Sequence, residues 1–485
     1  MTDIVALLAL AIILPAISNW RLALLLTLSM GFAQDVLRKL TPGEPVIMVL
    51  LFTPVFAIAT LGLMMRGGKL SLNPMFDLHP SLRAPILVFL CIIAAQVLLT
   101  IANTGSVVLA GLGIMIYLLP FVALMVAMYF ANNIGAVAGA LKVYIFFSLL
   151  FSLGVYLNVL GYQEGILDSV GVGLFVYPDE GGVLKLPSGF FRAAETAAWH
   201  GATAAALAAL LVMLRLFPGG PLVGIAVIAI LVGAVVLTGR RKMAVEMLLF
   251  SVIFVTLLAA YGGRGLRLVA LLGCLCAAVY LGQLLFVQEQ TGFNLRPYVS
   301  RYATVAQEVS GRLEDMTVGS FHSVVARNGW AGSGAGTAAQ GSAQFGGGTQ
   351  LVGFGAEGGI ARLLAELGVH GLLAGLWMAV GFAQACHASI RDLQQTAHWR
   401  WSLLSTGLVS LLIANIMVFA TAGQVFGDPF VLLVLGLLLG FVLRARGQVN
   451  APQPRTSAEG HQSDHPSGDA DDDGDDDRNT GGFRT

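Results

Sequence analysis

The sequence predicts an all-α, polytopic integral membrane protein with about 12–14 transmembrane helices. Of the 485 residues, 56% are hydrophobic and only 11% are charged, whereas soluble proteins carry about 25% charged residues. The hydrophobic residues also gather into runs long enough to cross about 30 Å of hydrocarbon as helices. The net charge of zero offers no basic surface for a nucleic acid, so no nucleic-acid partner is expected.

Thirteen apolar runs follow one another along the chain. The first has no basic segment before it and no small-residue cleavage site, so we expect a retained first helix. The four cysteines show neither zinc nor redox spacing and are expected to pack within the helices. The predicted spans are residues 3–18, 21–37, 45–65, 84–102, 106–130, 136–160, 197–217, 221–238, 243–261, 267–288, 360–385, 401–421 and 429–444.

The Lys and Arg residues of the short loops predict the orientation. Four basic segments fall on one side when the spans alternate: 66–83, 262–267, 387–400 and 444–447. The positive-inside rule assigns that side to the cytoplasm. The same alternation places loops 161–197 and 289–359 on the outer side. We therefore expect a membrane domain over residues 1–445 with two outer loops, the longer of them partly helical.

Residues 446–485 are rich in Asp, Gly, Ser and Pro and lack apolar periodicity. We expect them to form a disordered acidic tail in the cytoplasm. Asp469, Asp471 and Asp473 match the opening of a calcium loop, but Thr480 stands where the closing Glu is needed. No metal site is therefore predicted.

The end of loop 161–197 carries charged and aromatic residues at helical spacing. Arg192, Glu195 and Trp199 share one helix face, and His200 lies on the adjacent face. One interpretation is an interfacial anchor, in which an Arg–Glu pair sits beside an aromatic belt residue. The other is a cation at the top of a ligand cavity, with His200 beside it. The spacing does not decide between them.

The turn at residues 238–242 places Arg240, Arg241 and Lys242 on the outer side, against the positive-inside preference. Glu246, one turn later, or lipid phosphates could neutralise this cluster. Alternatively, the cluster binds an anionic, phosphorylated ligand, since the planar fork of Arg matches phosphate. The unusual position of the cluster favours the ligand site.

Loop 289–359 has about 70 residues, too many for a simple connector, so we expect a partly helical lid. Among its cations, Arg312 and Arg327 are candidates for ligand binding. The element Gly-Ser-Gly-Ala-Gly at 332–336 lacks the Lys-Ser/Thr pair and the preceding strand of a nucleotide loop. Its glycines are expected to let the backbone approach a ligand or to permit lid motion.

A helix is predicted to start after Glu357 and to carry Arg362 and Glu366 in its first turns. Glu357 is either a charge that is favourable at a helix N-terminus or a functional carboxylate. Arg362 and Glu366 are at the i,i+4 spacing of an ion pair. Arg362 also remains a candidate ligand-binding residue.

These features occur together in a recognisable order. An outer-loop Arg at the head of a helix precedes a Thr-Gly-Arg-Arg turn at 238–241, which precedes the glycine element and the segment Ala-Arg-Leu-Leu-Ala-Glu-Leu-Gly-Val-His-Gly-Leu-Leu at 361–373. In this order the chain resembles the superfamily of O-antigen ligases and O-antigen polymerases over roughly residues 130–440, with the Glu-Leu-Gly ending as the most specific part.

The resemblance implies a GT-C-type membrane fold in the bacterial inner membrane, with an active site that faces the periplasm. It implies a substrate of undecaprenyl-diphosphate-linked oligosaccharide and no metal or other cofactor. Arg192 matches the family's first loop arginine, and Arg241 matches the arginine of the turn, with Arg240 in place of a small residue. Ligases carry a His eleven residues before the Gly of the Glu-Leu-Gly element, where this chain has Glu357. This departure favours a polymerase or a divergent exopolysaccharide member of the superfamily.

The residue types suit an inverting glycosyl transfer. Arg192 and Arg241 would stabilise the charge on the departing diphosphate, and Glu357 would accept the proton of the acceptor hydroxyl. Arg240, Lys242, Arg312, Arg327, Arg362 and His200 would bind substrate. Two alternatives stay open, namely a ligase that joins the glycan to a lipid or protein acceptor, and a flippase for the lipid-linked glycan. Transporters usually show internal repeats, which this sequence lacks, so we favour an enzyme. Expected partners are the bilayer and other membrane proteins of polysaccharide assembly.

Overall fold

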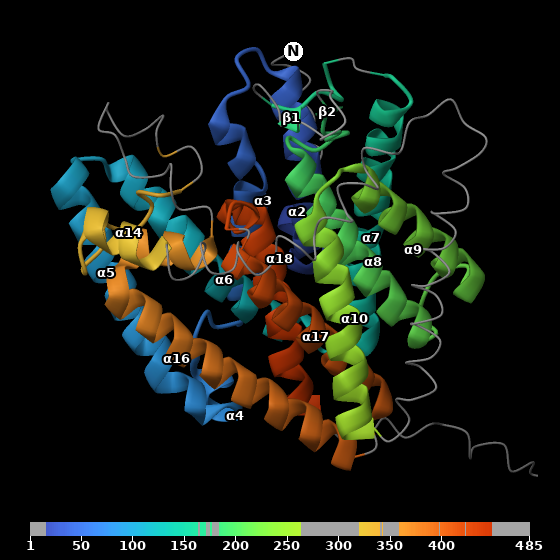
Figure 1. Ribbon diagram of the computed structural model, residues 1–485. Coiled ribbons are helices and arrows are strands. Elements are labelled where there is room, and N and C mark those ends of the chain that lie inside the picture. The colour runs from blue at the N-terminus through green and yellow to red at the C-terminus, as the bar shows by residue number, and fades with distance from the viewer. Residues whose placement is uncertain are drawn as a thin grey trace, which may run out of the picture. The chain divides into compact units, whose positions relative to one another are not determined.

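The computed structural model describes most of the membrane body and part of each outer loop. The described residues are 16–162, 165–170, 175–176, 184–262, 320–339, 342, 358–396, 398–421 and 423–448. Nearly all regular structure in these ranges is helical (Figure 1). The exception lies in loop 161–197, where strand β1 (Phe175–Val176) pairs antiparallel with β2 (Leu184–Lys185). The all-α prediction therefore holds for the membrane body but misses this strand pair.

The helices follow the predicted spans closely. They are α2 (Trp20–Leu40), α3 (Phe52–Met65), α4 (Asn73–Leu78), α5 (Arg83–Thr104), α6 (Val107–Phe130), α7 (Ile134–Val159), α8 (Ala194–Met213), α9 (Gly220–Leu237), α10 (Arg241–Gly262), α14 (Ser320–Asn328), α16 (Gly359–Gln395), α17 (Trp399–Thr421) and α18 (Pro429–Ala445). Short 3-10 helices occur at Val46–Leu50, Pro80–Leu82, Val425–Gly427 and Arg446–Gln448.

Ten helices within the described ranges are long and apolar enough to cross a membrane. The chain is therefore a multi-pass membrane protein. Helix α2, with 21 residues, is not among the ten; it carries Arg21, Asp35, Arg38 and Lys39. Of the predicted spans, 267–288 lies outside the described residues, and 3–18 lies mostly outside them.

The compact membrane unit includes the 3-10 helix that follows α18. In this helix, Arg446 donates from Nε to Asp392 Oδ2 at 2.8 Å. The rest of the predicted tail lies outside the described residues.

Contacts between distant loops confirm that segments 66–83, 387–400 and 444–447 share one end of the bundle, whereas 263–267 lies outside the described residues. The Nε2 atom of His79, in segment 66–83, lies 3.2 Å from the carbonyl oxygen of Leu443 near the end of α18. The Arg446–Asp392 pair joins the same end of α18 to segment 387–400. Tyr261, at the end of α10, contacts His387 through its hydroxyl group. We call the end of the bundle remote from these contacts the loop end.

The described parts of both outer loops lie at the loop end. Lys39, in the last turn of α2, donates from Nζ to the carbonyl oxygen of Gly189 at 2.7 Å. In the second loop, Ser333 donates its N–H to Ala365 O at 2.8 Å in the first turns of α16. The alternation of spans predicted from the sequence is therefore correct for these segments.

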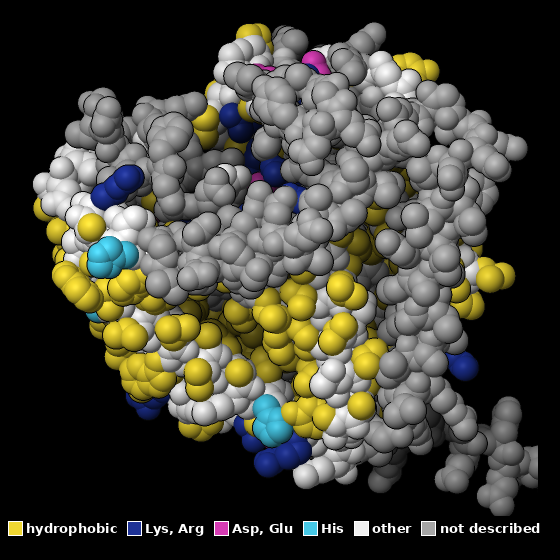
Figure 2. Space-filling model, viewed as in Figure 1, with side chains coloured by type: hydrophobic (Ala, Val, Ile, Leu, Met, Phe, Trp, Pro, Cys, Tyr) yellow, Lys and Arg dark blue, Asp and Glu magenta, His cyan; other side chains and the backbone are white. Residues whose placement is uncertain are grey.

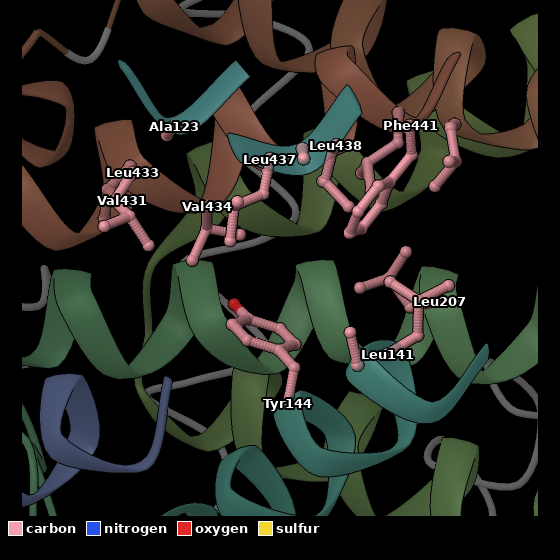
Figure 3. Close-up of a cluster of buried hydrophobic side chains, with 14 of the residues drawn as sticks. Ala123, Leu141, Tyr144, Leu207, Val431, Leu433, Val434, Leu437, Leu438 and Phe441 are labelled. Carbon is pink, nitrogen blue, oxygen red and sulfur yellow. The ribbon is translucent and has the colours of Figure 1, made fainter. Parts of the chain in front are cut away.

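The core of the bundle lies between α6, α7, α8 and α18. Figure 3 shows Val434, Leu437 and Phe441 of α18 facing Leu141 and Tyr144 of α7, with Leu207 of α8 beside them. Helices α6 and α18 pack so closely at Gly436 that an added Cβ atom would lie only 2.4 Å from Pro120 O. Small residues at such contacts allow the backbone proximity that holds membrane helices together.

A second, smaller core lies under the long loop. Val324 of α14 packs against Ala361, Leu364 and Ala365 in the first turns of α16 (Figure 1). These turns are set off from the rest of α16 by a kink at Gly368, where φ is 68° and ψ is −172°. There, Val369 donates its N–H to Trp330 O at 3.0 Å in place of a helical bond. The kink thus fastens the loop to the helix that follows it.

Candidate functional site

Arg192 is held between two carboxylates. Its Nη2 atom donates to Asp428 Oδ2 at 2.8 Å, and its Nη1 atom lies 3.6 Å from Asp35 Oδ1. Its backbone N–H also donates to Asp35 Oδ2 at 3.1 Å. All three side chains are buried. Burial lowers the pKa of Arg192, but Asp428 and Asp35 outweigh this effect and leave the pKa raised, so the guanidinium group stays charged.

This arrangement changes both interpretations of Arg192. The guanidinium group is not paired with Glu195, as the helical spacing suggested, and it already has two anionic partners. Asp428 also caps α18 by accepting the N–H of Phe430 at 2.9 Å. Arg192 therefore joins α2, the segment before α8 and the start of α18. Because its guanidinium group already has two carboxylate partners, we expect Arg192 to position these elements at the loop end.

His200 and Trp199 lie inside the bundle. His200 is 1% exposed, and its Nδ1 atom lies 2.8 Å from the hydroxyl oxygen of Tyr144. Its ring stacks on Phe191, with centroids 5.4 Å apart. Trp199 is fully buried and donates from Nε1 to Asn415 Oδ1 at 2.7 Å. The predicted aromatic belt residue and substrate-binding histidine are thus enclosed by protein, because α8 is covered on all sides.

The turn between α9 and α10 presents the predicted basic cluster at the loop end. Gly239 takes a left-handed conformation, with φ of 67°, which lets the chain reverse before α10 begins. Arg240 is partly buried, and its Nη2 atom lies 3.4 Å from Glu195 Oε2 on α8. Arg241 and Lys242, also partly buried, form the first turn of α10.

Glu246, which its position one turn later offered as one partner that could neutralise the cluster, contacts a different residue. Its Oε1 atom accepts from Asn415 Nδ2 at 2.9 Å, deep between α10 and α17. Among the described residues, the carboxylate that pairs with Arg240 is Glu195, which comes from another helix. Sequence spacing could not reveal this partner, because it depends on how α8 and α10 pack.

The glycine element of the long loop packs against protein. A Cβ atom at Gly334 would lie 2.4 Å from Thr100 Oγ1, and one at Gly336 would lie 2.2 Å from Leu109 O. The N–H groups of Gly334 and Ala335 donate to Glu366 O and Gln96 O, at 3.1 and 3.2 Å. The glycines therefore allow a close approach to α5, α6 and α16, and the amides of Gly334 and Ala335 help to hold the element there.

The predicted ion pair between Arg362 and Glu366 is present, with Nε and Oε1 3.4 Å apart. Glu366 is fully buried and also accepts from Tyr117 Oη at 2.6 Å and from the N–H of Ala338 at 3.0 Å. Glu366 thus joins α16, α6 and the glycine element. A single carboxylate with three such donors holds the long loop in place.

The remaining candidates are separate from this network or outside the described residues. Arg327 is exposed in the last turn of α14. Arg312 and Glu357 lie outside the described residues. Gly358, the residue after Glu357, lies against Gly423, which follows α17 on the way to Asp428. Helix α16 therefore begins at the loop end, on the same side of the bundle as Arg192 and Arg240.

The loop end is hollowed on the face that Figure 2 shows. Dark blue Lys and Arg side chains, with acidic side chains among them, lie within the hollow. Asp35, Asp428 and Tyr117 were not predicted as site residues. Asp428 carries one recognisable signal, since an Asp before Pro429 is typical of a helix start. Nothing in the spacing of Asp35 indicates its contact with Arg192.

Comparison of the chain with protein-family models and with curated proteins finds no match. The fold and the site define the class on their own. The chain is an α-helical multi-pass membrane protein, with a cluster of paired charges at the end of the bundle that carries its long loops.

Proposed function

We propose that this protein is a membrane glycosyltransferase that polymerises undecaprenyl-diphosphate-linked glycan repeat units at the periplasmic face of the bacterial inner membrane. The observation that carries the proposal is the basic turn at 240–242, which lies at the end of the bundle opposite the basic loops. By the positive-inside rule that end faces the periplasm. A cluster of Arg and Lys on that side suits an anionic ligand, and a lipid-linked diphosphate presents its charges at this depth.

The residues take these roles in the proposed reaction. Arg240, Arg241 and Lys242 hold the diphosphate and stabilise the charge that it gains as it departs. Arg192 acts through Asp35 and Asp428, since it fixes the ends of the helices that surround the turn. The reaction also needs a carboxylate as a general base, for which the sequence offers Glu357 as one candidate. Direct attack by the acceptor hydroxyl inverts the anomeric carbon.

The lipid-linked glycans of a deletion strain test this proposal. If the protein is a polymerase, single repeat units should accumulate on the periplasmic leaflet. The wild-type gene should reverse this accumulation, whereas the Arg241→Ala variant at equal protein level should not. Accumulation of finished polymer indicates a ligase. Accumulation on the cytoplasmic leaflet indicates a flippase. Either of these outcomes contradicts the proposed reaction.

A further inference from the structure

Glu195 is the carboxylate nearest to the basic turn in the described structure. It occupies the first turn of α8, and its Oε2 atom lies 3.4 Å from Arg240 Nη2. A carboxylate in the first turn of a helix interacts favourably with the helix dipole, which accounts for its location. The dipole does not account for the partner, which belongs to the turn between α9 and α10. This contact places a negative charge in the cluster that the proposed function assigns to the diphosphate.

The Glu195–Arg240 pair is loose in comparison with the neighbouring pair. Arg192 Nη2 and Asp428 Oδ2 are 2.8 Å apart, the length of a strong charge-assisted hydrogen bond. Glu195 and Arg240 are 3.4 Å apart, and the buried Nε atom of Arg240 has no hydrogen-bond partner among the described residues. One carboxylate oxygen therefore leaves part of the guanidinium group unsatisfied. A diphosphate, which offers several oxygens and more negative charge, is a stronger partner for the Arg240 cation than Glu195 is.

The other described carboxylates at the loop end are occupied elsewhere. Asp35 and Asp428 hold Arg192, Asp168 pairs with Lys185 at the surface, Glu246 accepts from Asn415, and Glu366 accepts from Tyr117 and Ala338. Glu44 lies on the turn that follows α2, outside the basic cluster. Glu195 is thus the carboxylate of the described chain that a ligand of the basic turn would both contact and release.

We propose that Glu195 occupies the position of the diphosphate in the unliganded protein and becomes the general base once the donor binds. This inference rests on the proposed function and deepens it. The diphosphate takes Arg240, and Glu195 is freed beside the reacting sugar. The acceptor oxygen then forms its bond to the anomeric carbon while the bond from that carbon to the diphosphate oxygen breaks. The bonding pair leaves on the diphosphate, and the hydroxyl proton passes to the Glu195 carboxylate.

Substitution of Glu195 in the full-length protein, reconstituted with an undecaprenyl-diphosphate-linked oligosaccharide, tests the assignment. Glu195→Gln keeps the shape of the side chain but cannot accept the proton. We expect kcat to fall on the order of 10²–10⁴-fold, the contribution of a general base, while the KM for the donor changes little. The fall in kcat that the wild type shows at low pH, where the general base becomes protonated, should be absent in this variant. Added formate should partly restore turnover to Glu195→Ala, because a small carboxylate fits the vacated position.

Two further variants separate this inference from its alternatives. Asp168→Asn, which removes a carboxylate from an exposed ion pair at the same end, should leave kcat unchanged. If Glu357→Gln lowers kcat and removes its fall at low pH, while Glu195→Gln changes neither, Glu357 is the base and the assignment of Glu195 is wrong. A parallel loss of donor binding and turnover in Glu195→Gln, without formate rescue, would also overturn it. Absence of transfer by the wild-type protein would instead overturn the proposed function, and this inference with it.

Discussion

Arg192 and Asp428 lie 236 residues apart in the sequence and form a 2.8 Å charge-assisted hydrogen bond at the loop end. Asp428 is 1% exposed and also caps α18, so one carboxylate fixes both the segment before α8 and the start of α18. A buried pair of this kind is costly to break, because the remaining charge has no solvent to compensate it. Arg192 is therefore more important for the shape of the site than for direct contact with substrate.

The first prediction follows from this bond. Asp428→Ala removes the partner of Arg192 and the cap of α18 together, so we expect a loss of about 3–5 kcal/mol in unfolding free energy. Denaturant unfolding in detergent micelles measures it. The matched control is Asp168→Ala, which breaks the exposed pair with Lys185 and should cost about 0–1 kcal/mol. If Asp428→Ala is as stable as the wild type but inactive, Arg192 binds substrate directly and the positioning role is wrong.

The second prediction concerns the glycine element. Gly334 has a φ of 112°, and a Cβ atom there would lie 2.4 Å from Thr100 Oγ1. Gly334→Ala should therefore displace the element from α5 and lower the melting temperature. Gly329→Ala is the matched control, since Gly329 also has a positive φ of 72° but has nothing within 4 Å of the added atom. Equal melting temperatures for the two variants would show that backbone strain, and not the close approach to α5, explains the glycine at 334.

The third prediction is a pH dependence at the end opposite the loops. Burial lowers the pKa of His79 to about 4, whereas an unfolded chain binds this proton near pH 6.5. The unfolded state therefore binds more protons between these values, so stability is complete above about pH 6.5 and declines as the pH falls towards 4. His79→Gln retains an N–H donor for Leu443 O without titrating. Its melting temperature should fall less than that of the wild type between pH 7.5 and pH 5, and an identical fall would contradict this account.

The fourth prediction separates the two arginines of the basic turn. If Arg241 binds the diphosphate as a planar fork, Arg241→Lys should lose on the order of 10²-fold in transfer, nearly as much as Arg241→Ala. Arg240, whose 3.4 Å contact with Glu195 is loose and whose proposed role is to supply charge, should tolerate Lys. The measurement is transfer from a purified lipid-linked donor at equal protein level. If Arg240→Lys loses transfer and Arg241→Lys does not, Arg240 is the residue that binds the diphosphate as a fork. If neither substitution changes the transfer rate, the turn has no catalytic role.

The membrane spans were predictable because run length and loop charge depend on local sequence. The contacts between His79 and Leu443 and between Arg446 and Asp392 confirm that alternation placed the basic loops at one end. The i,i+4 pair of Arg362 and Glu366 was predictable for the same reason, since helical spacing alone brings these side chains together.

The partners of Arg192 and Arg240 could not be predicted in this way. Each partner belongs to a distant helix, whereas helical spacing offered only Glu195 for Arg192 and Glu246 for the basic turn. The choice between them depends on how α2, α8, α10 and α18 pack, which no local pattern encodes. The role of the glycines was also missed, because a glycine that approaches a neighbouring helix and one that approaches a ligand look the same in a sequence.

The most direct test of the central claim uses the purified protein in lipid vesicles with an undecaprenyl-diphosphate-linked repeat unit as the only glycan. Chain length on the lipid and free undecaprenyl diphosphate are measured together. A polymerase predicts glycans of increasing length, with one undecaprenyl diphosphate released for each bond formed, and neither product from Arg241→Ala. Repeat units that remain single, or that cross the bilayer without a new glycosidic bond, would contradict the assignment of this protein as a glycosyltransferase.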